Sequence, residues 1–433
     1  MRYPGVVMNG GPSRRDVLRL AGVSAGTLLL GCGDNQTSSP PGADQAVAIL
    51  EPTNDAFIVS IWAPFARLAS VSVQVGRTPF LSTMIGIDPE SGQAMIDVSG
   101  LEPSQAYEVT VTTNDGVRLG PHHVRTAPSA DDARPVRIAV SADLDPSPEF
   151  TSDILSHLTA ADPEVYVSIG DFPYTDNGPP AVTVTGYRAR HAELRTDPGV
   201  RSWLETVGVR AIYDDHEFRN DWDAMFEAAE RDRFVAAMQV WDEFFPIRHP
   251  VDNIRYRRWM WGANIECFLL DCRRFRSANA APDDANKTML GAQQRAWLVD
   301  GVISSTAAFK VVFTSIPLAF GIGNDHWSSF TTERDAIFAA LVGTPGVLFV
   351  SGDQHSFGAF EHAHGVREFQ IGPLARGVIM PGPLVPGVLF RSAQYNFGLI
   401  DVDGDTLTFS GVGATGEVFY KETLTAAQLT PVS

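Results

Sequence analysis

Carboxylates and histidines follow four apolar runs of this chain, at the points where the runs end. The runs and the polar residues behind them are IAVSADLD, VYVSIGDFPY, VRAIYDDHE and VLFVSGDQH. The residues concerned are Asp143, Asp171, Asp215, His216, Asp353 and His355. Ionised carboxylates that are buried close together repel one another and lose hydration unless a cation compensates them. The pattern therefore predicts a metal site.

The apolar runs also predict the elements that must bring these residues together. Residues 165–169 and 347–350 form continuous β-rich sequence, which is typical of parallel strands buried on both faces. The ends of parallel strands in an open α/β sheet gather at one edge. We therefore expect the polar residues to meet in one cleft, although they are far apart in the chain.

Such a cluster is suited to phosphoester hydrolysis. That reaction needs an oxygen nucleophile, neutralisation of the phosphoryl oxygens and an acid for the leaving oxygen, and two metal ions supply the first two. Oxygen ligands with one or two imidazoles suit iron, manganese, calcium or magnesium better than a soft metal bound by thiolates. A single strand-terminal aspartate more often caps a turn, but four such strand ends together favour a functional site.

The composition is that of a globular protein with an excess of acidic residues. The 433 residues are 44% hydrophobic and 10% aromatic, which is enough for two domains with large cores. The net charge of −18 comes from 33 basic and 51 acidic residues, and the acidic residues are dispersed, which argues against a nucleic-acid-binding surface. A phosphate substrate remains compatible with this charge, because dications bound at the cluster would supply a local positive field.

The three cysteines, Cys32, Cys267 and Cys272, are too few for a disulfide framework. We interpret Cys267 and Cys272 as buried thiols, with metal ligation as the less favoured alternative. The spacing of a zinc finger is absent from the sequence.

The N-terminus has the features of an export signal. Ser13 to Arg19 contains two adjacent arginines, and the apolar stretch 20–30 that follows is too short to span a membrane. This pattern resembles a signal for twin-arginine translocation, so residues 1–32 are expected to be a signal peptide that the twin-arginine machinery recognises. The expected location is the cell envelope or periplasm.

The residues before Cys32, Leu29-Leu30-Gly31, resemble the lipobox of bacterial lipoproteins. Lipidation of Cys32 is the favoured interpretation, and a cysteine present by chance is the alternative. Residues 33–46 are polar and rich in Ser and Pro, so they are expected to form a flexible tether. The membrane would then be contacted through the lipid anchor only.

The rest of the chain is predicted to form two folded parts. Residues 47–128 alternate short strand-like runs with turns, which predicts an all-β sandwich, and residues 100–109 resemble the tyrosine-containing corner of fibronectin type III domains. After a linker, residues 135–433 alternate strand-like and helical runs, which predicts an α/β domain. The remaining histidines singled out here, His122, His123, His362 and His364, are expected to be solvated.

Three motifs make a family resemblance specific. Gly170-Asp171-Phe172-Pro173-Tyr174, Asp214-Asp215-His216-Glu217 and Gly352-Asp353-Gln354-His355 occur in this order. They resemble the signature of PhoD-like alkaline phosphatases and phosphodiesterases, within the calcineurin-like metallophosphatase superfamily. Flanking stretches such as LDCRRFR at 270–276 agree. The resemblance covers about residues 46–433 and implies a fibronectin- or Ig-like sandwich followed by an α/β metallophosphatase core of two sheets flanked by helices.

The resemblance also implies cofactors and roles. Two or more metal ions are expected, Fe³⁺ and Ca²⁺ by analogy with the family, with Mn²⁺ or Zn²⁺ as alternatives. Asp171 would bridge two metals, Tyr174 would offer a phenolate to iron, and His216 would act beside the phosphate. The other implied ligands are Asp143, Asp215, Asn220, Asp353 and His355. Arg273 would bind a phosphate oxygen, or else form a structural ion pair.

One position departs from the family pattern. The family usually has Ser-Cys at the end of the first strand of this domain, whereas here Ser141 is followed by Ala142. Asp143 is placed to substitute as ligand. A carboxylate in place of a thiolate would shift the metal preference, which puts iron in question.

The expected function is that of an exported hydrolase of phosphate monoesters, diesters or both, whether small molecules or polymers. The expected mechanism is in-line attack on phosphorus by a metal-activated hydroxide. The alternative is a non-catalytic, metal-stabilised surface lipoprotein that binds phosphate-rich polymers.

Overall fold

The computed structural model describes residues 44–145, 153–248, 251 and 254–433. Cys32, the predicted signal at 1–32 and most of the predicted tether lie outside these residues, so they stay predictions. Among the helices of the described ranges, none has the length and apolar character needed to cross a bilayer. Residues 41–433 form one unit by their internal contacts.

The first part of the chain consists of strands, as the turn-rich alternating sequence predicts. Strands β4 (Thr78–Gly86), β3 (Leu68–Val75), β6 (Ala106–Thr113) and β7 (Arg118–Arg125) form a four-stranded antiparallel sheet in this order. Every second residue of β6 is buried, which gives the sheet one apolar face. That face packs on β1 (Ala46–Leu50), β2 (Ala56–Trp62) and β5 (Gln93–Ser99) in a separate hydrophobic core. The Tyr107 hydroxyl accepts a hydrogen bond from the Glu102 amide at 2.9 Å, which closes the predicted tyrosine corner.

The two parts share one sheet. Its order is β20-β19-β18-β8-β9-β10-β1-β2-β5, and β1 joins β10 (Val209–Ile212) in parallel where Leu50 lies opposite Val209. Glu51, just beyond β1, is buried and accepts from Arg210 at 3.0 Å and from Arg257 at 2.9 Å. Burial alone would raise the pKa of Glu51, but the two arginines hold it below its usual value. The division at 128–135 stays a prediction.

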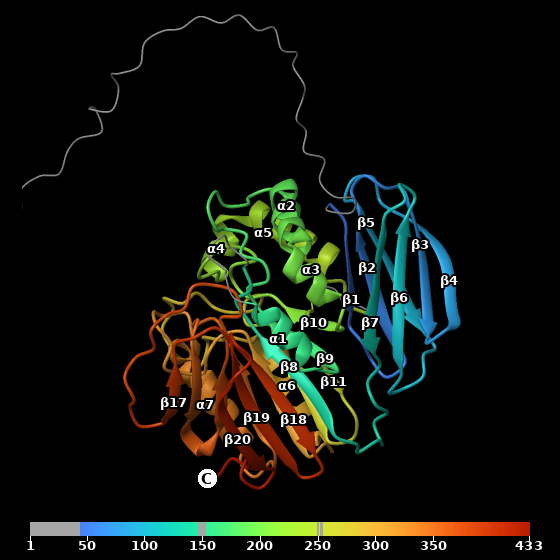
Figure 1. Ribbon diagram of the computed structural model, residues 1–433. Coiled ribbons are helices and arrows are strands. Elements are labelled where there is room, and N and C mark those ends of the chain that lie inside the picture. The colour runs from blue at the N-terminus through green and yellow to red at the C-terminus, as the bar shows by residue number, and fades with distance from the viewer. Residues whose placement is uncertain (1–43, 146–152, 249–250, 252–253) are drawn as a thin grey trace, which may run out of the picture. The chain divides into compact units, whose positions relative to one another are not determined.

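The remaining strands of the nine-stranded sheet are β8 (Val136–Ser141), β9 (Val165–Ile169), β18 (Asn396–Asp403), β19 (Thr406–Gly413) and β20 (Val418–Thr425). Strands β8, β9 and β10 run parallel, and all residues of β9 are buried, as its continuous apolar sequence predicts. Figure 1 shows β8, β18, β19 and β20 side by side, in the order that their pairings give.

A second sheet of seven strands packs against this one. Its order is β11 (Arg257–Met260), β12 (Ile265–Leu269), β13 (Phe309–Thr314), β14 (Val347–Ser351), β16 (Arg367–Gln370), β15 (Phe357–Glu361) and β17 (Val388–Ser392). The strands β12, β13, β14 and β16 are parallel. Apolar residues of both sheets, such as Val167 and Val350, belong to one core cluster.

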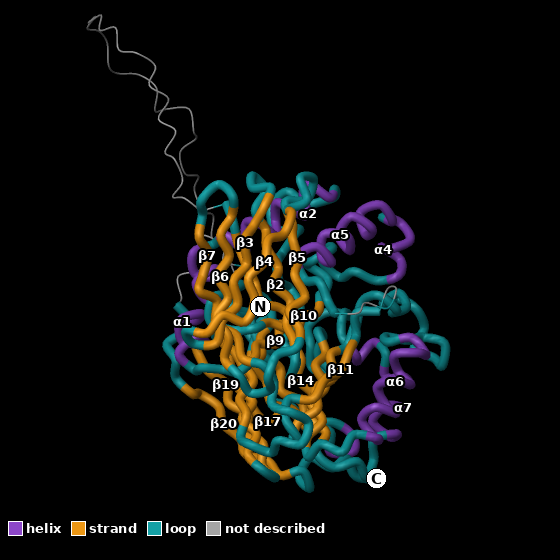
Figure 2. The backbone as a smooth tube through the Cα atoms, turned by 90° about the vertical axis from the view of Figure 1, so that its right-hand side faces the viewer, coloured by secondary structure: helices purple, strands orange, loops and turns teal. Residues whose placement is uncertain are grey.

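Helices flank the sheets. They are α1 (Ile154–Ala160), α2 (Val184–Thr196), α3 (Pro198–Leu204), α4 (Ala224–Ala229), α5 (Arg231–Phe244), α6 (Gly291–Ser304) and α7 (Thr331–Ala340), with 3₁₀ turns η1 (Trp327–Ser329) and η2 (Ala363–Gly365). Figure 2 shows α6 and α7 beside the strands β11 and β14. Helix α3 begins where Asp197 accepts from the amides of Gly199 and Val200, with proline in the first turn.

Burial confirms some expectations about single residues and corrects others. Cys267 and Cys272 are buried free thiols, as predicted. His122 was expected to be solvated, which is wrong: it is 1% exposed, and its Nδ1 lies 3.4 Å from the carbonyl of Leu204 at the end of α3. His362 is also not solvated, because its Nε2 lies 2.6 Å from the buried carboxylate of Glu368.

Candidate metal centre

The loops after β8, β9, β10 and β14 bring the predicted ligands together. The ligand atoms form four groups, and the atoms of each group lie within 4.8 Å of one another. The groups are Asp143, Asp171 and His355; Asp171, Asp215 and His216; Asp214, Asp215 and Asp353; and Asp215, Asp221 and Asp325. Because Asp171 and Asp215 belong to more than one group, the four groups form one continuous cluster. The polar residues that were predicted to meet at the ends of the parallel strands therefore lie together.

The backbone turns sharply at these strand ends. Asp143, Asp171, Asp353 and His355 have φ values of 60°, 56°, 72° and 51°. Non-glycine residues adopt this left-handed region uncommonly, and such positions concentrate at functional sites. At Gly170, with φ of 117°, an added Cβ would lie 2.4 Å from the Cβ of Asp214. Glycine at this position therefore lets the ends of β9 and β10 approach closely.

Buried carboxylate oxygens without hydrogen-bond partners indicate that the residues fit a metal. Asp143 Oδ2, Asp171 Oδ2 and Asp215 Oδ1 are buried and have no hydrogen-bond partner. Burial, together with the charges of Asp214 and Asp215, raises the pKa of Asp143 and of Asp171 well above their usual range. An unpaired buried carboxylate is costly, whereas cation coordination satisfies both its charge and its lone pairs. Hard oxygen donors with one or two imidazoles match the donor set predicted from the sequence.

Tyr174 and His355 meet within the cluster. The Tyr174 hydroxyl lies 2.8 Å from His355 Nε2 and 3.5 Å from Asp143 Oδ1, and Tyr174 is only 2% exposed. His355 Nδ1 lies 2.7 Å from the carbonyl of Gly377, so this nitrogen carries the proton and Nε2 presents its lone pair to the cluster. Metal-binding histidines are commonly oriented in this way. Burial lowers the pKa of His355 to about 4, which keeps the ring neutral.

His216 has a carboxylate partner that the sequence reasoning missed. Its Nδ1 lies 2.7 Å from Asp176 Oδ1, and its ring is 4.2 Å from that of Tyr174. Burial opposes a charge on His216, but Asp215 and Asp176 raise its pKa to about 9. Asn220 donates its backbone amide to Asp176 Oδ2 at 2.8 Å, and the residue is exposed. The structure thus places Asn220 beside Asp176, and its role as a ligand stays a prediction.

Arg273 lies in a buried network of ion pairs. Its Nε and Nη2 donate to the two oxygens of Asp214 at 2.6 and 2.7 Å, and its Nη1 pairs with Asp325. Arg273 is 2% exposed, and its Nη2 also lies 3.6 Å from Asp215 Oδ1. The structural ion pair that the sequence left open is therefore present, and contact with a phosphate stays a prediction.

Several further carboxylates lie in or beside the cluster, although the sequence analysis assigned them no role. Glu217 accepts from the amides of Asp171, Phe172 and Asp214 at 3.2, 2.8 and 2.9 Å, so it fixes the turns that present two predicted ligands. Burial raises the pKa of Glu217 to about 8. The others are Asp176, Asp214, Asp221 and Asp325. Asp214 and Glu217 stood within a motif, but Asp176 and Asp221 had no strand-end signal.

Comparison with known proteins agrees with this geometry. The sequence profile of a family described as PhoD-like phosphatase matches residues 150–385, more than half of the chain. The chain belongs to this family.

Among related proteins, alkaline phosphatase D of Bacillus subtilis (strain 168) is 24% identical to this PhoD-like chain over 309 residues. The match covers 60% of this chain and 53% of that protein, so the chain spans about half the length of this relative. The solved structure of PhoD superposes with a TM-score of 0.80 at 18% identity, covering 91% of this chain and 92% of that chain.

A purple acid phosphatase from yellow lupin (Lupinus luteus) seeds superposes with a TM-score of 0.64 at 11% identity, covering 88% of this chain and 74% of that chain. These likenesses concern the fold. They confirm the predicted order of a strand-rich N-terminal part followed by an α/β metallophosphatase core, and the family membership confirms the resemblance drawn from the three motifs.

Proposed function

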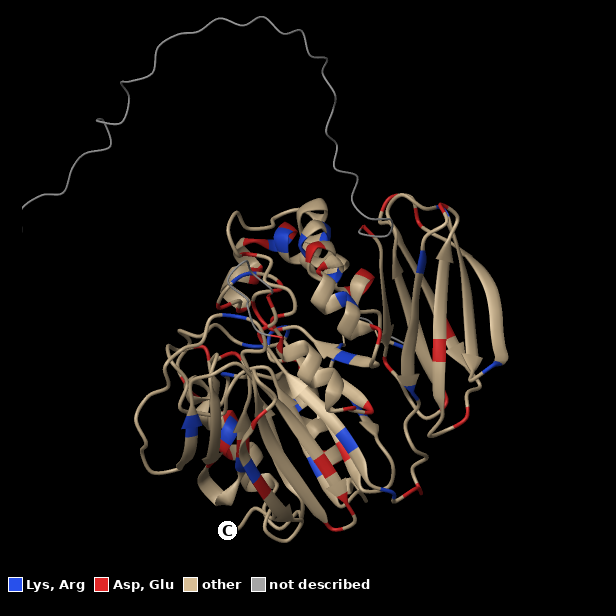
Figure 3. Ribbon diagram, in the orientation of Figure 1, with Lys and Arg blue, Asp and Glu red and all other residues tan. Residues whose placement is uncertain are grey.

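We propose that this PhoD-like chain is a metal-dependent phosphoric ester hydrolase that acts on phosphate monoesters, diesters or both. The observation that carries the proposal is the cluster of carboxylates at the ends of four strands, in which buried oxygens of Asp143, Asp171 and Asp215 have no hydrogen-bond partner. The name of its relative, alkaline phosphatase D, supports the same class of reaction. The charge distribution does not argue otherwise: Figure 3 shows acidic and basic residues spread over both the strand-rich part and the α/β part.

The proposed metal ligands are Asp143, Asp171, Tyr174, Asp215, Asp353 and His355, with Asn220 as an additional one. Bound cations supply the positive charge that neutralises the phosphoryl oxygens and makes water a better nucleophile. Fe³⁺ and Ca²⁺ follow the family resemblance, and Mn²⁺ or Zn²⁺ are the alternatives. The side chain of Ala142 offers no thiolate, so Asp143 takes the ligand position at the end of β8.

Side chains of the protein supply the proton for the leaving oxygen and orient the groups around it. The oxygen of water forms a bond to phosphorus and this water releases one proton to solvent, while the bond from phosphorus to the leaving oxygen breaks and His216 donates its proton to that oxygen. Asp176 holds His216 in orientation through the 2.7 Å contact with Nδ1. Arg273 positions Asp214 and Asp325, because its donors are directed at their carboxylates.

The test combines elemental analysis with kinetics. Purified protein is assayed with p-nitrophenyl phosphate and bis(p-nitrophenyl) phosphate, then stripped with a chelator and reloaded separately with iron, calcium, manganese and zinc. The proposal predicts turnover that falls on stripping and returns with metal. Metal-containing protein that binds phosphate polymers without turnover would support the alternative, a metal-stabilised surface lipoprotein.

We also propose export by the twin-arginine pathway and lipid anchoring at Cys32, supported by the sequence of residues 13–46. Replacing Arg14 and Arg15 with lysine is expected to leave the precursor in the cytoplasm. The Cys32→Ser variant is expected to be released as active soluble enzyme, because the tether and not the folded parts would hold the protein at the membrane. Cell fractionation locates both variants. If the double-lysine variant still reached the envelope, twin-arginine export would be contradicted. If Cys32→Ser stayed fully membrane-bound, lipid anchoring at Cys32 would be contradicted.

A further inference from the structure

We propose that an apolar patch beside the metal centre docks on an anionic lipid bilayer. The patch lies mainly on the loop that leads from Arg376 into β17. Its exposed side chains are those of Ile322, Ile379, Met380, Leu384, Val385 and Leu389. The N-terminal sequence predicts contact with the membrane through a lipid anchor only, so the patch is an additional contact, made by the folded part. It does not depend on the proposed hydrolysis.

Exposed apolar side chains are concentrated in this loop. Of the 18 large hydrophobic side chains that are exposed among the described residues, five lie between residues 379 and 389. Met380 is 77% exposed and Leu384 is 68% exposed. Ile322 adjoins them, because it lines a small hollow together with Pro381 of the loop. Single exposed apolar residues are common, whereas a contiguous group of them marks a surface that binds a protein or a membrane.

The loop is fixed by contacts within the chain. Arg391 of β17 donates through Nη1 to the carbonyl of Pro383 at 3.1 Å and through Nη2 to the carbonyl of Phe320 at 3.2 Å. Prolines at positions 381, 383 and 386 restrict the backbone further. Figure 1 shows the loop beside β17, the edge strand of the seven-stranded sheet. A surface that is formed in advance loses little conformational entropy when it binds.

The loop is attached to the metal centre where it begins. His355 Nδ1 donates to the carbonyl of Gly377 at 2.7 Å, and the His355 carbonyl accepts from the amide of Ile379 at 3.0 Å. Met380, the most exposed residue of the patch, follows directly in the chain. Docking of the patch would therefore bring the proposed ligand His355 near the surface of the bilayer.

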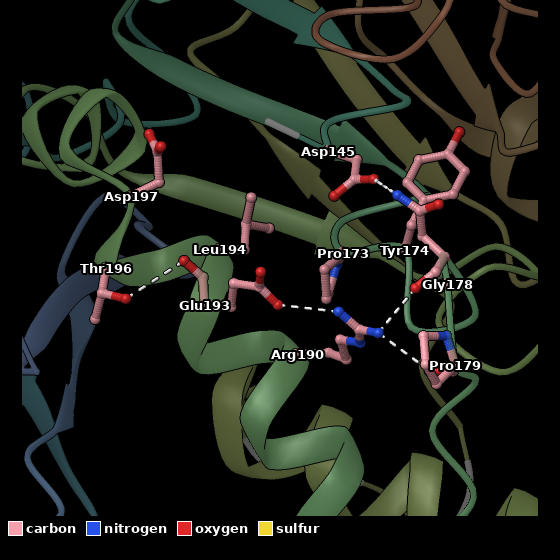
Figure 4. A pocket seen from close by; sticks show the side chains of 11 residues that line it. Asp145, Pro173, Tyr174, Gly178, Pro179, Arg190, Glu193, Leu194, Thr196 and Asp197 are labelled. Atoms are coloured by element: carbon pink, nitrogen blue, oxygen red, sulfur yellow. Dashed lines mark hydrogen bonds and ion pairs between the residues drawn. The ribbon is translucent and has the colours of Figure 1, made fainter. Parts of the chain in front are cut away.

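The charges around the loop favour an anionic surface. The chain has a net charge of −18, yet residues 369–400 contain no acidic residue and two arginines, Arg376 and Arg391. Arg376 is compensated, because its Nη1 lies 3.2 Å from Asp145 Oδ2. Figure 4 shows Asp145 in the wall of a cavity of about 530 Å³ between α2 and the loop after β9, beside Tyr174.

Arg391 has no such counter-charge. Its donors are directed at carbonyls, and among the described residues no carboxylate forms an ion pair with it. Glu361 lies near the end of the loop, where its amide donates to Gly387 at 2.8 Å, but Arg367 lies 3.9 Å from its carboxylate. Apolar side chains next to an uncompensated cation are the combination that interfacial segments use to bind anionic lipids. Acidic residues elsewhere on the surface are screened beyond about 10 Å at moderate salt.

A second copy of the chain fits the patch less well. A symmetric dimer would bring each patch against the same patch of the other copy, so that the two uncompensated Arg391 side chains would approach each other. A bilayer offers acyl chains to the apolar residues and phosphates to Arg391 at once. The contact is expected to be reversible, because stable anchoring takes more than one such signal. Release of Cys32→Ser on cell fractionation is therefore still expected.

The binding test is co-sedimentation of metal-loaded residues 33–433 with lipid vesicles. Residues 41–433 form one unit, and omission of residues 1–32 removes the apolar stretch 20–30 and Cys32 as other sources of binding. The vesicles contain phosphatidylcholine alone or in equal parts with phosphatidylglycerol. The chain is expected to bind the mixed vesicles about fivefold more strongly than the neutral ones, the effect of one cation near an anionic surface. Absence of binding to the mixed vesicles would overturn the inference.

Two aspartate substitutions test the apolar contact. Met380→Asp combined with Leu384→Asp is expected to weaken binding to the mixed vesicles about tenfold or more, because two side chains no longer enter the bilayer. The matched control is Met84→Asp combined with Leu68→Asp, the same changes at exposed positions of the strand-rich part, which is expected to keep the parental affinity. Thermal unfolding and metal content are compared to exclude misfolding as the cause. Equal affinity of the two double variants would overturn the inference.

A change of charge tests the role of Arg391. Arg391→Gln is expected to remove most of the preference of about fivefold for mixed over neutral vesicles, whereas Arg391→Lys keeps it, because lysine retains the charge. A preference in Arg391→Gln equal to that of the parent would overturn the choice of an anionic surface. Sedimentation equilibrium without vesicles tests the other occupant. A dimer that dissociates in the Met380→Asp and Leu384→Asp double variant, with no binding to vesicles, would assign the patch to a second copy and overturn the inference.

Discussion

Gly372 lies against the proposed ligand Asp143 so closely that a Cβ at position 372 would stand 2.3 Å from Asp143 Oδ2. Gly372 follows β16 and has a φ of 93°. Just beyond it, the amides of Leu374 and Ala375 donate to the carbonyls of Ala142 and Asp143, each at 3.0 Å. The loop after β16 is therefore hydrogen-bonded to the segment that follows β8, and it fixes the position of the Asp143 carboxylate.

The first prediction concerns this contact. Gly372→Ala is expected to displace the Asp143 carboxylate, to lower bound metal, and to reduce turnover about tenfold or more. Elemental analysis and kinetics measure both effects. The control is Gly343→Ala, because Gly343 has a φ of 81° but no atom within 4 Å of the added Cβ. It shares the backbone strain without the contact, so an equal loss of metal in both variants would contradict the role of Gly372.

The second prediction separates the proton donor from the ligands. His216→Ala is expected to keep its metals and to lose about 10²-fold or more in kcat, as for removal of a general acid. Asp176→Asn is expected to keep its metals with a smaller loss, about tenfold, because it only orients the ring. Metal content and kcat are measured on the same samples. Loss of metal from His216→Ala would make His216 a ligand instead of a proton donor.

The third prediction is a pH effect on stability at a position remote from the cluster. Burial lowers the pKa of His122 from 6.5 to about 4. Above pH 6.5 the ring is neutral in both the folded and the unfolded state, so its full contribution to the free energy of unfolding is present there. As the pH falls from 6.5 to about 4, the unfolded state takes up a proton that the folded state does not, and the free energy of unfolding falls by up to about 3 kcal/mol.

The variant that tests this effect is His122→Leu, which cannot take up the proton. Chemical denaturation between pH 4 and 7 is expected to show a free energy of unfolding that declines less in the variant than in the parent. The control is His123→Leu, the same change at the exposed neighbouring residue, which leaves the buried ring of His122 in place. Identical pH dependence of parent and His122→Leu would contradict the assigned cause.

The strand ends were predictable because their signal is local. Each carboxylate or histidine follows a buried run directly, so Asp143, Asp171 and Asp353 could be placed on one sheet edge from sequence alone. Asp176 could not be found in this way, because its role comes from a contact with His216, 40 residues away. The family motifs pointed to some residues that the strand-end pattern did not single out, since Asp214 and Glu217 stand inside one of these motifs.

Non-local pairing and burial account for what the sequence did not indicate. The pairing of β1 with β10 joins residues 50 and 209, and no periodicity in either strand reveals its partner. His122 and His362 carry polar rings, which favours exposure on average, but an α3 carbonyl and the Glu368 carboxylate lie next to them in the fold. The cavity beside Tyr174 likewise depends on contacts between α2 and the loop after β9.

The proposed metal centre is tested by measuring bound metal and phosphodiester turnover in Asp171→Asn. Asp171 belongs to two of the four ligand groups, and a carboxamide cannot bridge two cations with the charge of a carboxylate. We expect the variant to lose bound metal and to have no measurable turnover, while Asp300→Asn, at an exposed position of α6, keeps both. Full metal content with full turnover in Asp171→Asn would contradict a metal-dependent reaction in which Asp171 bridges two cations.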